Sequence, residues 1–272
     1  DEGRPANAPF YLFMHYMDPH DPYRDPGKPG RIYARNAMGD PSPEDYLEAF
    51  KRSYNFEIEY LDEHLGRFFT GLRERGLYDD TVIIFTSDHG EEFYEHGGWW
   101  HGLSLYEEQI AIPLIIKLPG NAHAGARQTM ITRHVDIAPT MAALAGLQPA
   151  EKMTGQALVQ PNQDLASAGP AESYAHLDFE GIRLNSVRTE STKLITANED
   201  NKRNYAPVEL YNLIEDPGEQ NNLAEEDIAT KDELLAKIDN FDAESKTQAV
   251  AAQDVMSPEE RAQLEALGYL GD

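Results

Sequence analysis

Carboxylate and imidazole side chains gather in one short stretch of the chain, between Thr81 and His101. Asp88 and His89 directly follow an apolar run rich in β-branched residues, and His96 and His101 come after a series of acids and glycines. A carboxylate supplies oxygen ligands and a neutral imidazole supplies a nitrogen ligand. With further carboxylates the pair suits calcium or magnesium, and with further imidazoles manganese or zinc. Two ligands do not hold a catalytic ion, so the stretch predicts part of a metal-dependent site.

The tripeptide Asp88-His89-Gly90 has a plainer explanation, which is a structural turn. Asp bonds nearby backbone in such turns, and Gly adopts positive φ there. An upstream loop favours a site instead, because His20 lies between two Asp-Pro steps just after another apolar run. If both runs are strands, His20 and Asp88 follow strand ends, where open α/β sheets bind their ligands. The alternatives are a solvated loop histidine for His20 and a histidine of a glycine-rich turn for His101.

Apolar runs without polar alternation predict the elements that position these residues. Such runs are typical of strands covered on both faces, as in a parallel sheet, and they occur at 9–16, 81–86 and 112–118. Between the first two, apolar residues recur at three- and four-residue steps and predict a long helix from Ser42 to Gly76. Strand, helix and strand form the unit that builds parallel sheets. A further helix is predicted at 135–146.

The chain changes character beyond residue 150. Short strand-like runs separated by turn residues predict a small antiparallel sheet, at 186–188, 193–196 and 209–213. Acid-rich segments with helical spacing follow at 219–244 and 257–268. We therefore expect an α/β fold in two parts. Residues 1–150 form a largely parallel central sheet flanked by helices, and residues 151–272 form a smaller antiparallel subdomain with helices.

Other polar and aromatic residues near the stretch are assigned to structure. His134 and Asp136 lie at a predicted helix start, where an Asp charge is favourable. Trp99 and Trp100 either line the entrance of a pocket or pack as ordinary aromatic side chains.

Composition limits the classes of partner. The 272 residues include 40% hydrophobic residues, enough for a sizeable core. A formal net charge of −25 argues against nucleic acid, since no broad basic face is available. There is no cysteine, so the chain builds neither disulfides nor a thiolate zinc site. No apolar run is long enough for a membrane span, and the N-terminus shows no signal-peptide pattern, so localisation stays open.

Several motifs follow one another along nearly the whole chain: PFYLFMHYMDPHDPY at 9–23, SDHGEEFYEHGGWWHGLSLYEE at 87–108, IPLIIKLPG at 112–120, HVDIAPTMAALAG at 134–146 and ELYNLIEDPGEQNNLA at 209–224. In this order they resemble the sulfatases of the alkaline-phosphatase superfamily. The resemblance implies an alkaline-phosphatase-like sandwich and a hydrolase of small-molecule or glycan sulfate esters. It also implies a periplasmic or extracellular location.

The resemblance assigns roles to four residues. Asp88 and His89 would be ligands of one divalent ion, usually Ca²⁺, with Mn²⁺, Mg²⁺ and Zn²⁺ as alternatives because many members have Asn in place of His89. His20 would contact the sulfate group. His101 falls near a family lysine and would contact the sulfate group or the leaving oxygen. A formylglycine, or a Ser or Thr hydroxyl, would be the nucleophile.

The departures from the family pattern carry an expectation of their own. The paired Asp and the nucleophile motif of the family's N-terminal portion do not occur here, so we expect this chain to be the C-terminal portion of such an enzyme. By itself it would be inactive, with an uncovered sheet edge. Two alternatives stay open: a phosphodiesterase or phosphonate monoester hydrolase of the same superfamily, and a sulfatase-like binding protein without catalysis.

Overall fold

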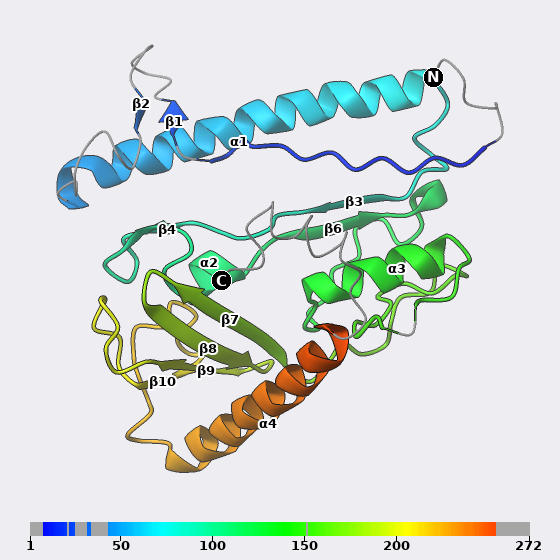
Figure 1. Cartoon of the computed structure of the whole chain (residues 1–272). Coiled ribbons are helices and arrows are strands. Elements are labelled where there is room, and N and C mark those ends of the chain that lie inside the picture. Colours follow the sequence, from blue (N-terminus) through cyan, green and yellow to red (C-terminus); the bar gives the residue numbers. More distant parts are fainter. Residues whose placement is uncertain (1–7, 21, 25–31, 34–42, 151, 254–272) are drawn as a thin grey trace. The chain divides into compact units, whose positions relative to one another are not determined.

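A computed structural model describes residues 8–20, 22–24, 32–33, 43–150 and 152–253 (Figure 1). The chain divides into two compact units. The first comprises Asp1–Ile84, Glu91–Trp100 and Ile115–Ala122, and the second comprises Phe85–Gly90, His101–Leu114 and His123–Asp272. The domain boundary expected near residue 150 stays a prediction. The helix expected at 257–268 lies outside the described residues.

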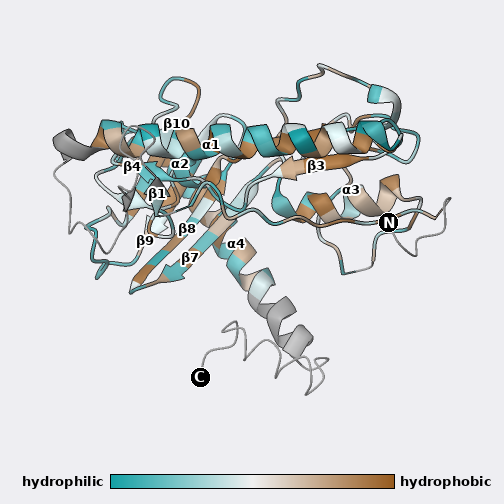
Figure 2. Ribbon diagram, turned by 90° about the horizontal axis from the view of Figure 1, so that it is seen from above, coloured by the Kyte–Doolittle hydropathy of each residue, from teal (hydrophilic) through white to brown (hydrophobic). Residues whose placement is uncertain are grey.

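The longest element of the first unit is helix α1, Pro43–Glu74, which confirms the long helix predicted from its apolar stripe. Figure 2 shows polar and apolar residues interleaved along it. The helix ends at Glu74, and Gly76 follows with a φ of 64°, which glycine readily adopts. Its buried face is more polar than the stripe indicates, since Ser53 and Glu57 are buried beside Phe50.

An aromatic cluster forms the core of the first unit. Strand β1, Tyr23–Arg24, pairs with β2, Ile32–Tyr33, and β4, Glu92–Phe93, pairs with β5, Trp99–Trp100; both pairs are antiparallel. The buried members of the cluster are Tyr23, Phe50, Phe93 and Trp100. The rings of Tyr23 and Trp100 stack with centroids 5.8 Å apart. Trp100 is therefore a packing residue, as one of the two readings of the tryptophan pair predicted.

Strands β3, Ile83–Thr86, and β6, Leu114–Lys117, pair with each other in a two-stranded sheet (Figure 1). Both strands were predicted, but as fully covered strands, and this was wrong. All of β3 is half-buried, and the side chain of Ile115 in β6 is 60% exposed. Neither strand has another neighbour within the described part of the chain.

Two further expectations about the sheet were wrong. The segment 9–16 is not a strand, and Tyr11 and Phe13 are each 74% exposed. An extended run becomes a strand only when its backbone groups pair with a neighbouring strand, and an apolar sequence does not supply that neighbour. For the same reason the largely parallel central sheet does not form among the described residues, where the paired sheets are small.

The second unit contains a four-stranded antiparallel sheet, which confirms the sheet predicted there. Its strands are β7, Ser173–Phe179; β8, Ile182–Arg188; β9, Thr192–Ala197; and β10, Val208–Asn212, in the order β10-β9-β8-β7. Glu180 and Gly181 connect β7 to β8 with φ of 52° and 83°. Positive φ at both residues of a two-residue loop suits the twist of an antiparallel hairpin.

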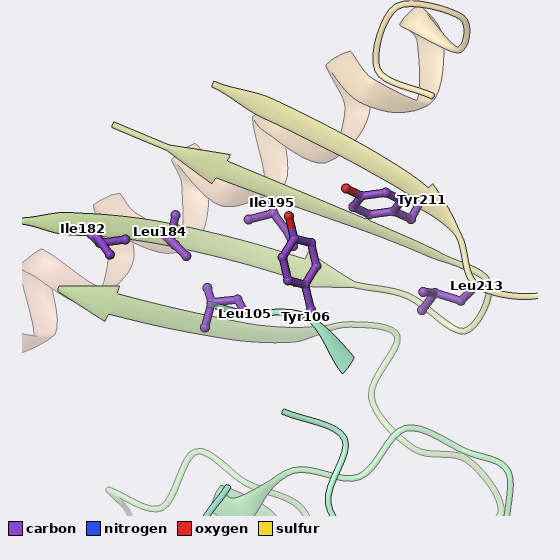
Figure 3. Close-up of a cluster of buried hydrophobic side chains, with 7 residues drawn as sticks. All are labelled: Leu105, Tyr106, Ile182, Leu184, Ile195, Tyr211 and Leu213. Carbon is purple, nitrogen blue, oxygen red and sulfur yellow. The ribbon is translucent and has the colours of Figure 1, made fainter. Parts of the chain in front are cut away.

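The two faces of this sheet carry separate clusters, because successive side chains of a strand point to opposite faces. On one face Val187, Leu194 and Leu210 pack against Leu234 and Ile238 of helix α4, Ile228–Gln253. This helix is the observed form of the acid-rich segment predicted at 219–244. The opposite face carries Ile182, Leu184, Ile195 and Tyr211, against which Leu105 and Tyr106 pack (Figure 3).

Short helices complete the described chain. They are α2, Glu107–Ile110; α3, Ile137–Leu144, confirming the helix predicted at 135–146; and the 3-10 turns η1, Pro119–Asn121, and η2, His134–Asp136.

Candidate active site

The loop after β3 holds Asp88 and His89 in a fixed local geometry. The Asp88 carboxylate accepts the backbone N–H of His89 at 3.0 Å, and its Oδ2 lies 3.8 Å from His89 Nε2. His89 Nδ1 lies 2.8 Å from the carbonyl oxygen of Gly90. A carbonyl only accepts, so Nδ1 carries a proton, and in the neutral ring Nε2 is an acceptor. A carboxylate oxygen and an imidazole lone pair thus lie on the same side of the loop.

This donor set fits part of a metal site. Ligating histidines usually donate their second ring nitrogen to a carbonyl or carboxylate, as His89 does to Gly90. Ligand atoms around one cation, each about 2.0–2.5 Å from it, lie a few ångströms apart, like Nε2 and Asp88 Oδ2. Within the described residues, however, no three His, Asp or Glu side chains converge on one point. The loop therefore offers two candidate ligands, Asp88 and His89.

Position 90 has room only for glycine, because the backbone of α2 passes close to it. A Cβ at this position would lie 2.1 Å from the carbonyl oxygen of Glu108, and the Gly90 N–H donates to the carbonyl of Gln109 at 2.8 Å. The turn reading of this tripeptide invoked positive φ, yet Gly90 is not among the positive-φ glycines. The local hydrogen bonds of a turn are present all the same, since Ser87 Oγ donates to the His89 carbonyl at 2.5 Å.

The structure brings His101 against His89. Their rings stack with centroids 4.0 Å apart and an angle of 28° between the ring planes. Gly102, with φ of 77°, turns the chain directly afterwards. Its N–H donates to the side-chain oxygen of Gln109 at 3.0 Å. Gln109 is buried, and its backbone carbonyl accepts from Gly90 while its side chain accepts from Gly102. It therefore binds both loops that carry the stacked rings.

Gln109 was missed by the sequence interpretation. A lone Gln in a short apolar segment carries no spacing signal, and its role depends on two glycine N–H groups that approach it in the folded chain. His134 was assigned to structure, and its Nε2 lies 2.8 Å from the carbonyl of Ser87, where it braces the Asp88 loop. Asp136 is likewise structural, because its buried carboxylate pairs with Arg133 at 2.9 Å.

His20 belongs to the first unit, so the ring pair of the second unit does not include it. Its backbone N–H lies 3.4 Å from a carboxylate oxygen of Glu57, a residue on the buried face of α1. Glu57 is a second residue that sequence reasoning missed. It occurs in a helix rich in acids, where the pattern indicates only a solvated face.

Two buried tyrosines help to hold the segment that follows His101. Tyr106 and Tyr211 both donate hydrogen bonds to one carboxylate oxygen of Glu209, at 2.8 and 3.0 Å. Burial, and then the negative charge of Glu209, raises the pKa of both phenols above its usual range. Both tyrosines therefore stay neutral donors and tie the segment before α2 to the sheet.

Comparison with known proteins decides the family. The sulfatase family model matches residues 2–147, more than half of the chain. The chain belongs to the sulfatase family. A second model, that of the C-terminal part of N-sulphoglucosamine sulphohydrolase, matches residues 94–244 of this chain.

Curated and solved sulfatase relatives cover most of the chain. Arylsulfatase K from Gallus gallus is 27% identical over an alignment of 251 residues, which covers 88% of this chain and 44% of that protein. The structure of BT4656 with its substrate D-glucosamine-2-N,6-O-disulfate is 28% identical, with a TM-score of 0.65 over 74% of this chain and 42% of that one. The phosphonate monoester hydrolase of Agrobacterium radiobacter is 27% identical, with a TM-score of 0.65 over 78% and 45%.

These matches show that the chain has an alkaline-phosphatase-like fold. The chain spans less than half of the length of each of these relatives. None of the helices in the described part of the chain combines the length and apolar character that a bilayer crossing requires.

Proposed function

We propose that the whole protein hydrolyses a sulfate ester of a small molecule or glycan and that this chain supplies part of its active site. Asp88 and His89 are ligands of a divalent ion, His101 is the proton donor to the leaving oxygen, and His20 contacts the sulfate group. The observation that carries the proposal is the stacking of His101 on His89 at 4.0 Å, beside the Asp88 carboxylate. It joins a ligand pair to an acid–base group.

The ligand pair suits a hard or borderline cation. Calcium is the expected ion, and Mn²⁺, Mg²⁺ and Zn²⁺ are the alternatives because His89 supplies nitrogen. When bound, such an ion would polarise the sulfuryl oxygens and stabilise transition-state charge by several kcal/mol. The neutral His89 ring with its proton on Nδ1 keeps Nε2 available as a ligand atom.

His101 suits proton transfer to the leaving alcohol. Cleavage of the ester leaves charge on that oxygen, and a positioned imidazole contributes roughly 10² to 10⁴ in rate. Gly102 and Gln109 fix where the His101 loop turns.

A second candidate function has an observation of its own. The phosphonate monoester hydrolase of Agrobacterium radiobacter matches with the same TM-score as the BT4656 complex. Both reactions transfer a tetrahedral oxyanion group, and a carboxylate–imidazole pair serves either. Rates of the whole protein on para-nitrophenyl sulfate and on bis(para-nitrophenyl) phosphate separate the two. The proposal requires the larger kcat/KM on the sulfate, and a larger value on the diester would overturn it.

Asp88→Asn tests the site itself. Loss of one anionic ligand should weaken calcium binding and lower turnover together, by about 10² to 10³ in rate if the ion contributes several kcal/mol. Calorimetric titration with Ca²⁺ and kcat on para-nitrophenyl sulfate measure the two effects. The matched control is Asp178→Asn on the exposed side of β7, which should change neither. If calcium affinity and turnover both survive Asp88→Asn, Asp88 is not a ligand.

A further inference from the structure

We propose that Gln109 is a positioning residue, which sets the His89 and His101 loops at their mutual distance and is itself anchored to the C-terminal sheet. The inference rests on the proposed roles of those two histidines. Gln109 uses two different oxygens: its backbone carbonyl accepts from Gly90 at 2.8 Å, and its side-chain oxygen accepts from Gly102 at 3.0 Å. Each glycine directly follows one of the two stacked histidines.

Only one of the two contacts requires the Gln109 side chain. The Gly90 contact needs only a backbone, since the glycine lies against the α2 backbone itself. The Gly102 contact needs an acceptor at the end of a side chain of this length. A methionine would reach equally far and offer almost no acceptor, which would leave the N–H of Gly102 without this partner. Gln109 therefore joins the two loops through one backbone and one side-chain hydrogen bond.

Helix α2 is a single short turn in which the backbone N–H of Gln109 donates to the Tyr106 carbonyl at 2.9 Å, and its N-cap residue Tyr106 makes no side-chain capping bond. Ionic contacts with β8 and β9 and a hydrogen bond to Glu219 add to these bonds. The backbone N–H of Glu107 donates to the Glu219 carboxylate at 2.6 Å. The carboxylate of Glu107 itself pairs with Lys193 at 3.1 Å and with Arg188 at 3.3 Å. Lys193 also pairs with Glu219 at 2.9 Å, and both side chains are fully buried.

This buried cluster differs from a surface ion pair. Burial raises the pKa of Glu219, and the Lys193 ammonium opposes that rise. In a low-dielectric interior, paired charges tolerate little displacement, so the cluster fixes the first residue of α2. Gln109 lies two residues further along the same helix, so the contacts that fix Glu107 also fix the place of Gln109. A route of direct contacts thus runs from β8 and β9 through α2 to the ring pair.

A double-mutant cycle in the whole protein tests whether Gln109 acts through His101. Gln109→Met should lower kcat about 10- to 100-fold with KM nearly unchanged, in the range found when partners of active-site groups are removed. The loss should be largest for aryl sulfates with poor leaving groups, as for His101→Ala. In the double variant, Gln109→Met should add no loss to that of His101→Ala. Additive losses would overturn the proposal.

Two matched variants separate positioning from folding. Gln109→Glu keeps an acceptor oxygen at the same reach and should restore most of the leaving-group dependence. Gln156→Met makes the same change at an exposed site and should leave kcat unchanged. If Gln109→Met lowers the melting temperature but leaves the leaving-group dependence as it was, Gln109 is only a structural residue and the proposal fails.

An NMR readout stays informative if the whole protein hydrolyses neither ester. With labelled histidine, rings 4.0 Å apart give a strong nuclear Overhauser effect between His89 and His101. Gln109→Met should weaken this signal, and Gln156→Met should not. An unchanged signal would refute the positioning role whatever the reaction. A weakened signal in a protein without hydrolase activity would refute the proposed function alone.

Discussion

At the scale of residues, the spacing of chemistry-bearing side chains predicted a site, and part of it comes together. Asp88 and His89 are neighbours in sequence, so their proximity follows from the chain. The stacking of His101 on His89 was not determined by spacing, because any turn between them could have sent His101 elsewhere. The metal-ligand and acid–base roles stay proposals. The role of His20 also stays a prediction, because His20 lies in the other unit.

Gly90 provides the sharpest test at this scale. In Gly90→Ala the new Cβ would lie 2.1 Å from the Glu108 carbonyl oxygen. The backbone of α2 would have to shift to relieve this clash, which costs folding free energy. We expect the free energy of unfolding to fall by about 1–3 kcal/mol or more, measured by denaturant unfolding. The control is Gly66→Ala in α1, where a Cβ meets nothing within 4 Å and alanine should gain up to about 1 kcal/mol. Equal effects at both sites would contradict the close approach.

At the scale of elements, local patterns predicted the longer helices and five of the ten described strands. The apolar stripe gave α1, and the short alternating runs gave β8, β9 and β10. The segment 9–16 shows the limit of such patterns. Its apolar run predicts a buried strand, yet it forms no strand and its side chains are largely exposed. Helical hydrogen bonds close within one segment, whereas a strand depends on a second segment, so patterns predict helices more surely than strands.

Helix α2 and the sheet give a prediction at this scale. Lys193→Met would leave Glu107 and Glu219 without the buried cation that they share. Breaking a buried pair in this way should cost about 3–5 kcal/mol of unfolding free energy. Lys237→Met is the matched control, because its partners Glu172 and Glu233 are partly exposed and the change should cost at most about 1 kcal/mol. Similar costs in chemical denaturation would show that the cluster does not anchor α2.

At the scale of the whole molecule, stability should depend on alkaline pH. Tyr106 and Tyr211 have pKa values raised by burial and by Glu209, whereas unfolded tyrosine titrates near about 10. Above that pH the unfolded chain loses two protons that the folded chain keeps, so stability falls as pH rises. Each tyrosine should contribute about 1.4 kcal/mol per pH unit.

Urea unfolding of the whole protein between about pH 9 and pH 11 measures this slope. Tyr211→Phe removes one of the two ionisable groups and should make the slope about 1.4 kcal/mol per pH unit shallower. Tyr11→Phe changes a tyrosine that is 74% exposed and should leave the slope as it is. A slope that is the same in all three proteins would show that the buried phenols do not govern alkaline unfolding.

The sequence by itself determined the long helix α1, the helix α3, the strands β8, β9 and β10, and the resemblance to the sulfatases. It also determined the choice of Asp88, His89 and His101 as candidates. Each of these depends on residue types within one segment or on the order of motifs. Only the tertiary structure decided that Gln109 joins two loops and that Lys193 lies buried between Glu107 and Glu219. The physical reason is that these contacts join segments distant in the chain, and hydrogen bonds and ion pairs act over a few ångströms of space.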